Sequence, residues 1–215
     1  SDDFALPTAA RILSQAPYSF DLSVMAWGPT LASGGTLVAL PKTVTDNFKQ
    51  LFETLPTMDL NVWVSTPSFM DICLLEPTFD GEHYPELTRF LFCGEELTHA
   101  TASALHQRFP AARIFNTYGP TETTVAVTQV EITAQLLQDY PRLPIGYVKA
   151  DTTIQVVDEQ LQPVPAGSEG ELLISGPSMS KGYLNNPEKT AKAFVTLNGH
   201  QVYRSCLLYT SPSPR

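Results

Sequence analysis

A short stretch in the middle of the chain, residues 116–122, gathers side chains that could do chemistry. It reads Asn-Thr-Tyr-Gly-Pro-Thr-Glu and presents two hydroxyl groups, a phenol ring and one carboxylate within a few residues. Residues 112–115 before it are mostly apolar and β-prone, which predicts a buried strand that ends where Gly119 and Pro120 force a loop. A loop at the carboxyl end of a strand is where an α/β sheet usually holds its ligand. The stretch therefore predicts a ligand-binding loop, and the alternative is a polar turn between strands.

The elements before this loop predict an α/β fold. Strands are predicted at residues 36–40, 61–64, 89–93 and 112–115, and helices at residues 22–32, 46–55, 67–75 and 98–109. Strands that alternate with helices at these lengths imply βαβ units and a largely parallel sheet with flanking helices. Asp21 or Ser23 is a candidate cap for the first helix, Gly34 ends it, and Asp46 is the predicted cap of the second.

After Glu122 the pattern changes. Strands are predicted at residues 125–130, 152–157, 171–174 and 201–204, with a short helix or linker at 135–142 and a helix at 186–194. These strands indicate a smaller antiparallel β subdomain. We therefore expect an α/β subdomain over residues 1–141 and a β-rich subdomain over residues 142–204. Residues 205–215 are rich in Ser and Pro without a core-forming period, and we expect them to be disordered.

Composition narrows the class of protein. The 215 residues are 43% hydrophobic and 16% charged, which is typical of a folded soluble domain. The net charge of -9, from 13 basic and 22 acidic residues, argues against a nucleic-acid partner. No apolar stretch is long enough to cross a bilayer. The sequence begins with Ser1 instead of an initiator Met and shows no charged-then-apolar signal, so we expect the start to be a cut inside a larger protein.

The cysteines and a few other residues have structural explanations. Cys73, Cys93 and Cys206 show no metal-type spacing, and an odd count favours free thiols in a reducing compartment, so we expect a cytoplasmic protein. The four histidines have no paired spacing for a metal site or a catalytic triad. Trp27 and Trp63 are expected in the core.

Several motifs, in one order, resemble those of the adenylate-forming superfamily: acyl-CoA synthetases, luciferases and the adenylation domains of peptide synthetases. Residues 116–122 resemble its aromatic-Gly-Pro-Thr-Glu motif. Residues 170–177 and 181–190, which include Gly-Glu-Leu and Lys-Gly-Tyr-Leu-Asn-Asn-Pro-Glu-Lys-Thr, resemble the next motif. The pair Tyr203-Arg204 stands where the superfamily continues with Thr-Gly-Asp. The set covers about residues 15–204 and implies the large N-terminal, AMP-binding domain of that fold, incomplete in this sequence.

Within the superfamily, three stretches resemble the D-alanine–D-alanyl carrier protein ligases. They are residues 20–25 with Pro29 and 34–36, residues 91–95, and residues 116–118. Peptide-synthetase domains usually carry Gly where Cys93 stands. The resemblance implies an enzyme that uses ATP and Mg²⁺ to convert D-alanine to D-alanyl-AMP. The phosphopantetheine thiol of a D-alanyl carrier protein then accepts the D-alanine, for D-alanylation of teichoic acids.

Two other interpretations stay open at this stage. One is an adenylation domain of a nonribosomal peptide synthetase that selects another small amino acid. The other is a non-catalytic nucleotide- or carrier-binding module. Substrate profiling separates the first from the ligase, and the flanking gene sequence tests the second.

The resemblance also assigns roles around the nucleotide. The implied nucleotide-binding residues are Asn116, Thr117, Tyr118, Gly119, Pro120 and Thr121. Tyr118 would stack on the adenine ring, and the Thr121 hydroxyl would donate to the phosphoryl charge as it develops. Glu122 would act with Thr121 in catalysis and bind Mg²⁺, since a hard cation between phosphates prefers carboxylate and water. The plain alternative for Glu122 is a solvated surface acid.

Three further residues are implied in binding the amino acid. The carboxylate of Asp21 would pair with the substrate ammonium, an interaction that is strengthened where the dielectric constant is low. Cys93 and Val125 would line a small pocket for the methyl group, with Cys93 acting by shape. The alternatives are a plain helix cap for Asp21 and a core-filling residue for Cys93.

Parts of the superfamily's machinery have no counterpart in these residues. The resemblance implies a Gly/Ser/Thr-rich phosphate loop upstream of Ser1, a ribose-binding Asp after Arg204 and a catalytic Lys in a small C-terminal domain. Residues 205–207 read Ser-Cys-Leu in place of Thr-Gly-Asp. We therefore hypothesise that residues 205–215 are foreign to the gene, and we expect the 215 residues alone to have little ligase activity.

Overall fold

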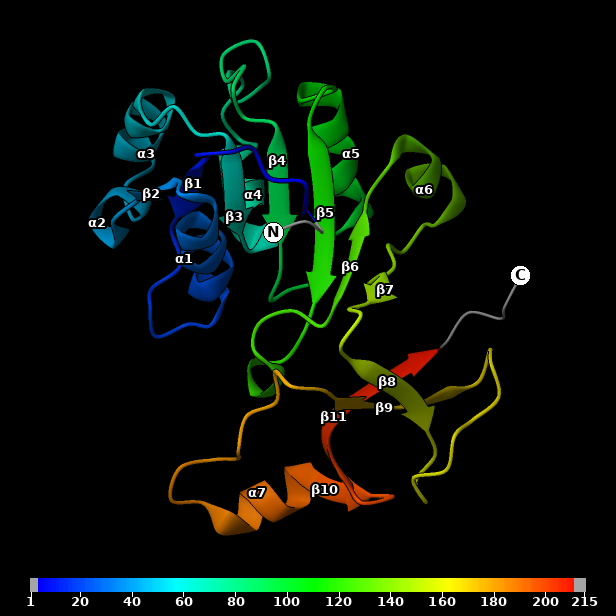
Figure 1. Cartoon of the computed structure of the whole chain (residues 1–215). Coiled ribbons are helices and arrows are strands. Elements are labelled where there is room, and N and C mark those ends of the chain that lie inside the picture. The colour runs from blue at the N-terminus through cyan, green and yellow to red at the C-terminus, as the bar shows by residue number, and fades with distance from the viewer. Residues whose placement is uncertain (1–3, 211–215) are drawn as a thin grey trace. The chain divides into compact units, whose positions relative to one another are not determined.

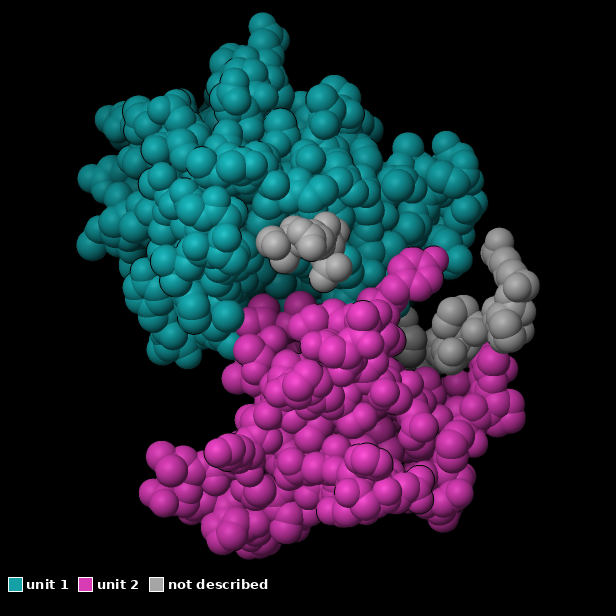
Figure 2. Space-filling view, viewed as in Figure 1, with its two compact units in different colours: residues 1–118, 128–146 teal, residues 119–127, 147–215 magenta. Residues whose placement is uncertain are grey.

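The computed structural model describes residues 4–210, and the chain folds into two compact units (Figure 2). The first unit comprises the chain up to Tyr118 together with Thr128–Gly146. The second comprises Gly119–Val127 together with the chain from Tyr147 onward. The short segment Gly119–Val127 therefore leaves the first unit in the middle of the 116–122 motif.

A largely parallel sheet forms the first unit (Figure 1). Its strands lie in the order β2 (Thr36–Ala39), β1 (Arg11–Ser14), β3 (Val62–Ser65), β4 (Arg89–Phe92), β5 (Arg113–Tyr118) and β6 (Thr128–Glu131). Neighbours from β2 to β5 pair in parallel, whereas β6 runs antiparallel to β5. The predicted α/β class with a largely parallel sheet is confirmed.

Helices flank this sheet in Figure 1. They are α1 (Leu22–Ser33), α2 (Lys42–Thr45), α3 (Phe48–Thr54), α4 (Pro67–Cys73), α5 (His99–Arg108) and α6 (Ala134–Asp139), with a 3-10 turn, η2 (Leu55–Thr57), after α3. The core between them is aromatic. The ring centre of the fully buried Trp63 lies 5.3 Å from that of Phe79, and the ring centre of Phe90 lies 4.9 Å from that of Phe109. The expected core position of Trp63 is confirmed.

Two local predictions in this unit are wrong. Trp27 is 37% exposed, because α1 buries the stripe that contains Leu22, Met25 and Ala26, and Trp27 lies outside it. Asp46 does not cap α3; the Asn47 side chain does, by accepting a hydrogen bond from the Gln50 amide at 3.2 Å. The unpredicted helix α2 ends at this point, and Asp46 pairs instead with Lys42 at 2.6 Å.

An antiparallel sheet organises the second unit. Its strands lie in the order β10 (Phe194–Leu197), β11 (His200–Thr210), β9 (Glu169–Ser175) and β8 (Thr153–Val157). The unit also contains the turn η3 (Thr121–Thr123), the two-residue strand β7 (Tyr147–Val148) and helix α7 (Pro187–Ala193). Val157, Leu173 and Val202 form a small core. The smaller antiparallel part that the sequence predicts is confirmed, although strand β10 was not predicted and its first residue, Phe194, was predicted as the end of a helix.

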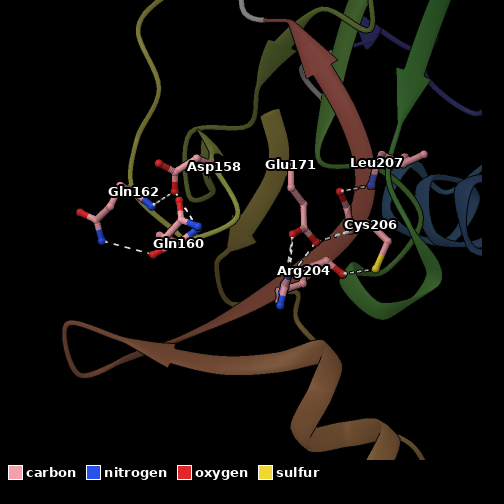
Figure 3. Close-up of polar contacts among 8 residues, drawn as sticks. Asp158, Gln160, Gln162, Glu171, Arg204, Cys206 and Leu207 are labelled. Carbon is pink, nitrogen blue, oxygen red and sulfur yellow. Dashed lines mark hydrogen bonds and ion pairs between the residues drawn. The ribbon is translucent and has the colours of Figure 1, made fainter. Parts of the chain in front are cut away.

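The expectation of disorder from residue 205 onward is wrong for residues 205–210, which belong to β11. Strand β11 pairs with β9 through Leu208 opposite Glu171, after a register shift that begins at Arg204. Figure 3 shows how the Glu171 carboxylate holds this part of the chain: it accepts hydrogen bonds from the Arg204 guanidinium at 2.6 Å and from the Cys206 amide at 3.1 Å. Backbone pairing with β9 needs no hydrophobic period in the sequence, so composition did not reveal this strand.

Residues 211–215, the rest of the expected tail, lie outside the described residues. The hypothesis that residues 205–215 are foreign to the gene stays a prediction. Within residues 4–210, no helix combines the length and apolarity needed to span a membrane.

Candidate functional site

Strand β5 extends three residues further into the motif than predicted. The backbone of Asn116 pairs with Phe92 of β4 on one side and with Val130 of β6 on the other. Tyr118 still pairs with Thr128. Asn116, Thr117 and Tyr118 are therefore strand residues, and the predicted loop begins only at Gly119.

The side chains of Asn116 and Thr117 donate hydrogen bonds to backbone carbonyls of the first unit. The Thr117 hydroxyl donates to the Phe92 carbonyl at 2.7 Å, and the Asn116 amide donates to the Pro144 carbonyl at 2.8 Å. Both residues are buried, whereas Tyr118 at the end of the strand is only half-buried. The two side chains thus fix the end of β5, where the sequence predicted groups that face a ligand.

The second half of the motif is a compact turn in the second unit. A side chain on Gly119 would begin 2.5 Å from the Val125 carbonyl oxygen, so only glycine fits this approach. Thr124 and Val125 both adopt left-handed backbone angles, with φ of 60° and 67°. This conformation ends the turn and delays β6 to Thr128, although a strand was predicted from residue 125.

Val125 is an unusual residue for such a conformation. It is β-branched, and the left-handed region costs a non-glycine residue about 1–3 kcal/mol when the surrounding structure imposes it. The side chain is 5% exposed. Strain of this kind concentrates at ligand-binding positions, which suits the predicted role of Val125 in a pocket.

Glu122 is held by residues of a loop in the same unit. Its carboxylate oxygen Oε1 accepts a hydrogen bond from the Tyr183 hydroxyl at 2.5 Å. Its backbone carbonyl accepts from the Ser180 amide at 2.7 Å. The Thr124 hydroxyl donates to the Ser178 carbonyl at 2.8 Å. The turn is therefore fastened to residues 178–183, and its one carboxylate has a fixed orientation.

Tyr183 and Ser180 are contacts that sequence reasoning missed. The 181–190 stretch was identified as a motif, but no role was assigned to Tyr183, because sequence does not reveal which distant side chain a phenol meets. Tyr203, 7% exposed, is a second phenol near Glu122. The hydrogen bond to Glu122 raises the pKa of Tyr183, while burial above all, with the Glu122 charge, raises the pKa of Tyr203. Both phenols therefore stay protonated at neutral pH and can donate to a carboxylate.

Asp21 occupies the predicted cap position of α1 but does not act as a cap. Its side chain accepts no capping hydrogen bond, and its backbone is already helical, with φ of -63° and ψ of -23°. The residue is half-buried. The capping explanation for this carboxylate therefore fails, which leaves its oxygens available to a ligand.

Residues next to Asp21 and next to Cys93 lie close together in the first unit. A side chain on Gly94 would begin 3.8 Å from the Phe20 ring. Cys93 itself directly follows β4 and is 3% exposed. None of the three cysteines, all within residues 4–210, forms a disulfide; Cys73 is buried as well, and Cys206 is exposed. Burial suits Cys93 both as a pocket wall and as a core residue, so its role stays a prediction.

His83, His99 and His106 each make a polar contact. His99 and His106 each contact a backbone carbonyl through Nε2, those of Leu137 and Ile132 respectively. His83 pairs with Asp80 at 2.8 Å on the surface. In the part of the chain that the structure describes, no group of three His, Cys, Asp or Glu side chains is arranged to hold a metal ion.

Comparison with known proteins identifies the relatives of this chain. A curated D-alanine–D-alanyl carrier protein ligase from Lactiplantibacillus plantarum is 71% identical over 205 residues, 95% of this chain. The chain spans 40% of the length of that relative. The predicted resemblance to these ligases is confirmed.

Solved structures agree with the fold. The Vibrio cholerae adenylation domain AlmE, in complex with glycyl-adenosine-5'-phosphate, superimposes with a TM-score of 0.84 at 30% identity, over 98% of this chain and 40% of that chain. A four-domain nonribosomal peptide synthetase, AB3403, bound to AMP and glycine, gives a TM-score of 0.85 at 30% identity, over 98% of this chain and 16% of that chain.

A family model also matches most of the chain. Residues 1–184 match the family described as AMP-binding enzyme. That range contains Asp21, Cys93, the whole 116–122 motif and Val125. The chain therefore belongs to the AMP-binding enzyme family.

Proposed function

We propose that this chain is part of a ligase that activates D-alanine with ATP and transfers it to a carrier protein. The observation that carries the proposal is the 71% identity to a protein of that name over 205 residues. A peptide-synthetase adenylation domain for another small amino acid is the second candidate. It is favoured only by solved structures at 30% identity, such as the synthetase bound to AMP and glycine.

The proposed reaction has two steps. In the first, a carboxylate oxygen of D-alanine bonds to the α-phosphorus of ATP while the bond to pyrophosphate breaks, which gives D-alanyl-AMP. In the second, the phosphopantetheine thiol of the carrier protein loses its proton and attacks the D-alanyl carbonyl carbon, and AMP leaves. The thioester so formed supplies D-alanine for esterification of teichoic acids. We place the enzyme in the cytoplasm, where ATP is available.

The end of β5 and the turn after it are the proposed nucleotide site. The half-buried Tyr118 ring offers a flat face for adenine, and Gly119 and Pro120 let the backbone approach the phosphates closely. The exposed Thr121 hydroxyl is free to donate to the α-phosphoryl group as negative charge develops on it. Because Asn116 and Thr117 bind the backbone, we assign them to shaping this site.

Glu122 is the proposed ligand of Mg²⁺. A protein site with a single carboxylate fits this ion, because Mg²⁺ keeps several waters and is bound by one or two carboxylates together with substrate phosphates. The carboxylate of Glu122 is oriented by the Tyr183 hydroxyl, as such a ligand requires. When bound, Mg²⁺ would neutralise phosphate charge and so favour departure of pyrophosphate.

Asp21, Cys93 and Val125 are the proposed amino-acid site. The Asp21 carboxylate makes no capping hydrogen bond and is available to the substrate ammonium. Such a pair explains the choice of an amino acid over a fatty acid. Buried Cys93 and Val125 have small side chains that suit a methyl group. Cys93 and Val125 contribute the shape of the pocket, and none of the three residues forms or breaks a covalent bond.

The test is amino-acid-dependent exchange of pyrophosphate into ATP by the full-length protein. D-alanine is expected to support exchange at least tenfold better than glycine or L-serine, and transfer to a phosphopantetheine-loaded carrier protein should follow. A preference for another amino acid would favour the peptide-synthetase interpretation. No exchange with any amino acid would refute both.

Asp21→Asn is the sharpest variant for the amino-acid site. Loss of the carboxylate partner is expected to raise the KM for D-alanine by about 10–100-fold, since a hydrogen-bonded charge is worth about 1.5–3 kcal/mol. The KM for ATP should stay within about twofold. Asp139→Asn, which alters an exposed carboxylate at the end of α6, is the matched control and should leave both values unchanged.

A further inference from the structure

The hydroxyl of Tyr183 makes a close contact with Glu122. It donates to Oε1 of the carboxylate at 2.5 Å, across 61 positions of sequence. The Ser180 amide binds the Glu122 carbonyl oxygen at 2.7 Å, so both the backbone and the side chain of Glu122 are held by one loop. A carboxylate on a turn would otherwise sample several rotamers. These two contacts select one of them.

The Tyr183 ring is itself fixed by its neighbours. Its backbone amide donates to the Thr190 hydroxyl at 2.9 Å, at the start of α7. The Lys189 ammonium lies 4.7 Å from the centre of the Tyr183 ring, and the Phe194 ring meets it edge-on with centres 5.8 Å apart. Phe194 also packs on Tyr203, with centres 5.2 Å apart. The phenol is therefore presented to Glu122 by a packed aromatic group rather than by a mobile side chain.

The chemistry of this pair suits a cation ligand. A phenol that donates to one carboxylate oxygen leaves the remaining lone pairs of the carboxylate for other partners. An ammonium or guanidinium in the same place would neutralise the carboxylate and compete with a metal ion, which the neutral phenol does not.

We propose that Tyr183 is a positioning residue that orients the Glu122 carboxylate for a divalent cation bound with ATP. This inference rests on the proposed role of Glu122 and adds a residue to it. A hydrogen bond to a metal-ligating carboxylate, from a residue that does not itself touch the metal, fixes the orientation of that carboxylate, and its loss typically costs about 10–100-fold in metal affinity. Tyr183 acts through Glu122 and does not touch the metal or the substrate.

The test measures Mn²⁺ affinity of the full-length protein in the presence of ATP, by electron paramagnetic resonance of the free ion. Tyr183→Phe keeps the ring and removes the hydroxyl. It is expected to weaken Mn²⁺ binding about tenfold, equivalent to about 1.4 kcal/mol. The affinity for ATP measured in EDTA and the KM for D-alanine should stay within about twofold. Tyr147→Phe, which alters an exposed phenol, is the matched control and should change nothing.

A double variant separates positioning from packing. In a Glu122→Gln background, Tyr183→Phe should cause no further loss of Mn²⁺ affinity, because the carboxylate it orients is gone. An additional tenfold loss would overturn the inference, as would unchanged Mn²⁺ affinity in Tyr183→Phe alone. Equal weakening of Mn²⁺ and of metal-free ATP binding would also overturn it, because that result indicates a general structural role.

Failure of the inference and failure of the proposed function give different results. If Glu122→Gln binds Mn²⁺ as the wild type does, the role of Glu122 itself is wrong. If Glu122→Gln weakens binding and Tyr183→Phe does not, only the positioning role is wrong. Should Tyr183→Phe fail to fold, Tyr183→Leu takes its place; it also lacks the hydroxyl and is expected to weaken Mn²⁺ binding about tenfold.

Discussion

The two halves of the 116–125 stretch are held in place by different interactions. The backbone of residues 116–118 is paired with β6, Asn116 is also paired with β4, and the side chains of Asn116 and Thr117 add hydrogen bonds. The turn of residues 119–125 has no strand neighbour; single polar contacts fasten it to residues 178–183. Substitutions in the strand half should therefore lower the free energy of unfolding. Substitutions in the turn half should alter function with little effect on that free energy.

The largest effect is expected for Ile114→Ala. Ile114 is fully buried in β5, and removal of a large aliphatic side chain from such a position costs about 2–5 kcal/mol. Both tryptophans, Trp27 and Trp63, lie in the first unit, so tryptophan fluorescence during denaturation reports the stability of that unit. Thr121→Ala, an exposed change in the turn half, should shift the same transition by less than about 0.5 kcal/mol. Similar costs for the two variants would contradict the contrast.

The elements of the first unit that precede Asn116 were easier to predict from sequence than the strand half itself. The apolar run before Asn116, the Pro at the first position of α4 and the Gly34 that ends α1 are local signals, and each gave the right element. Gly34 has φ of 66°, the left-handed cap that its type favours. The extension of β5 to Tyr118 was missed because it depends on pairing with β6, a partner further along the chain.

Sequence reasoning proposed the residues of the candidate site, but it could not propose their arrangement. Glu122 was singled out from its motif, while its partner Tyr183 lies 61 positions away and only folding brings the two together. For Asp21 the sequence offered two explanations, and the backbone of α1 removed the capping one. The strand at residues 205–210 was missed because composition suggested disorder where the backbone of β9 supplied pairing partners.

A matched pair of variants sharpens the comparison at the level of one hydrogen bond. Thr117→Val and Thr124→Val each remove one hydroxyl that donates to a backbone carbonyl. The Thr117 bond to Phe92 is buried, so its loss should cost about 1–3 kcal/mol of stability. The Thr124 bond to Ser178 is exposed, where water replaces the lost partner, and the cost should be below about 0.5 kcal/mol.

Two measurements follow this pair. Tryptophan fluorescence should detect the loss in Thr117→Val and none in Thr124→Val. Hydrogen–deuterium exchange should instead detect Thr124→Val locally, as faster exchange of the Ser180 amide, which binds the Glu122 carbonyl. Faster exchange throughout the second unit in Thr124→Val would show that the turn supports folding after all, and the proposed division between the halves would fail.

The smallest effect concerns the other end of β5, where Arg113 binds Glu131 through two hydrogen bonds, of 3.0 and 2.5 Å. The Arg113 guanidinium lowers the pKa of Glu131 below its usual value of 4.5. A lowered folded-state pKa means that the pair stabilises the first unit above about pH 4.5 and loses this contribution as the pH falls through the folded-state pKa. Because both side chains are about a third exposed, the contribution should be below about 1 kcal/mol.

Glu131→Gln tests whether this pair matters to the strand half. The stability advantage of the wild type, measured by fluorescence-detected denaturation at pH 7, 5, 4 and 3, should be constant down to about pH 5 and shrink below pH 4.5. Glu53→Gln is the control, because the Lys49 contact of that exposed carboxylate is long, at 3.9 Å. An advantage that is absent at every pH would mean that pairing with β4 and β6 alone fixes the strand half. The turn half has no such strand pairing and would still depend on its polar contacts to residues 178–183.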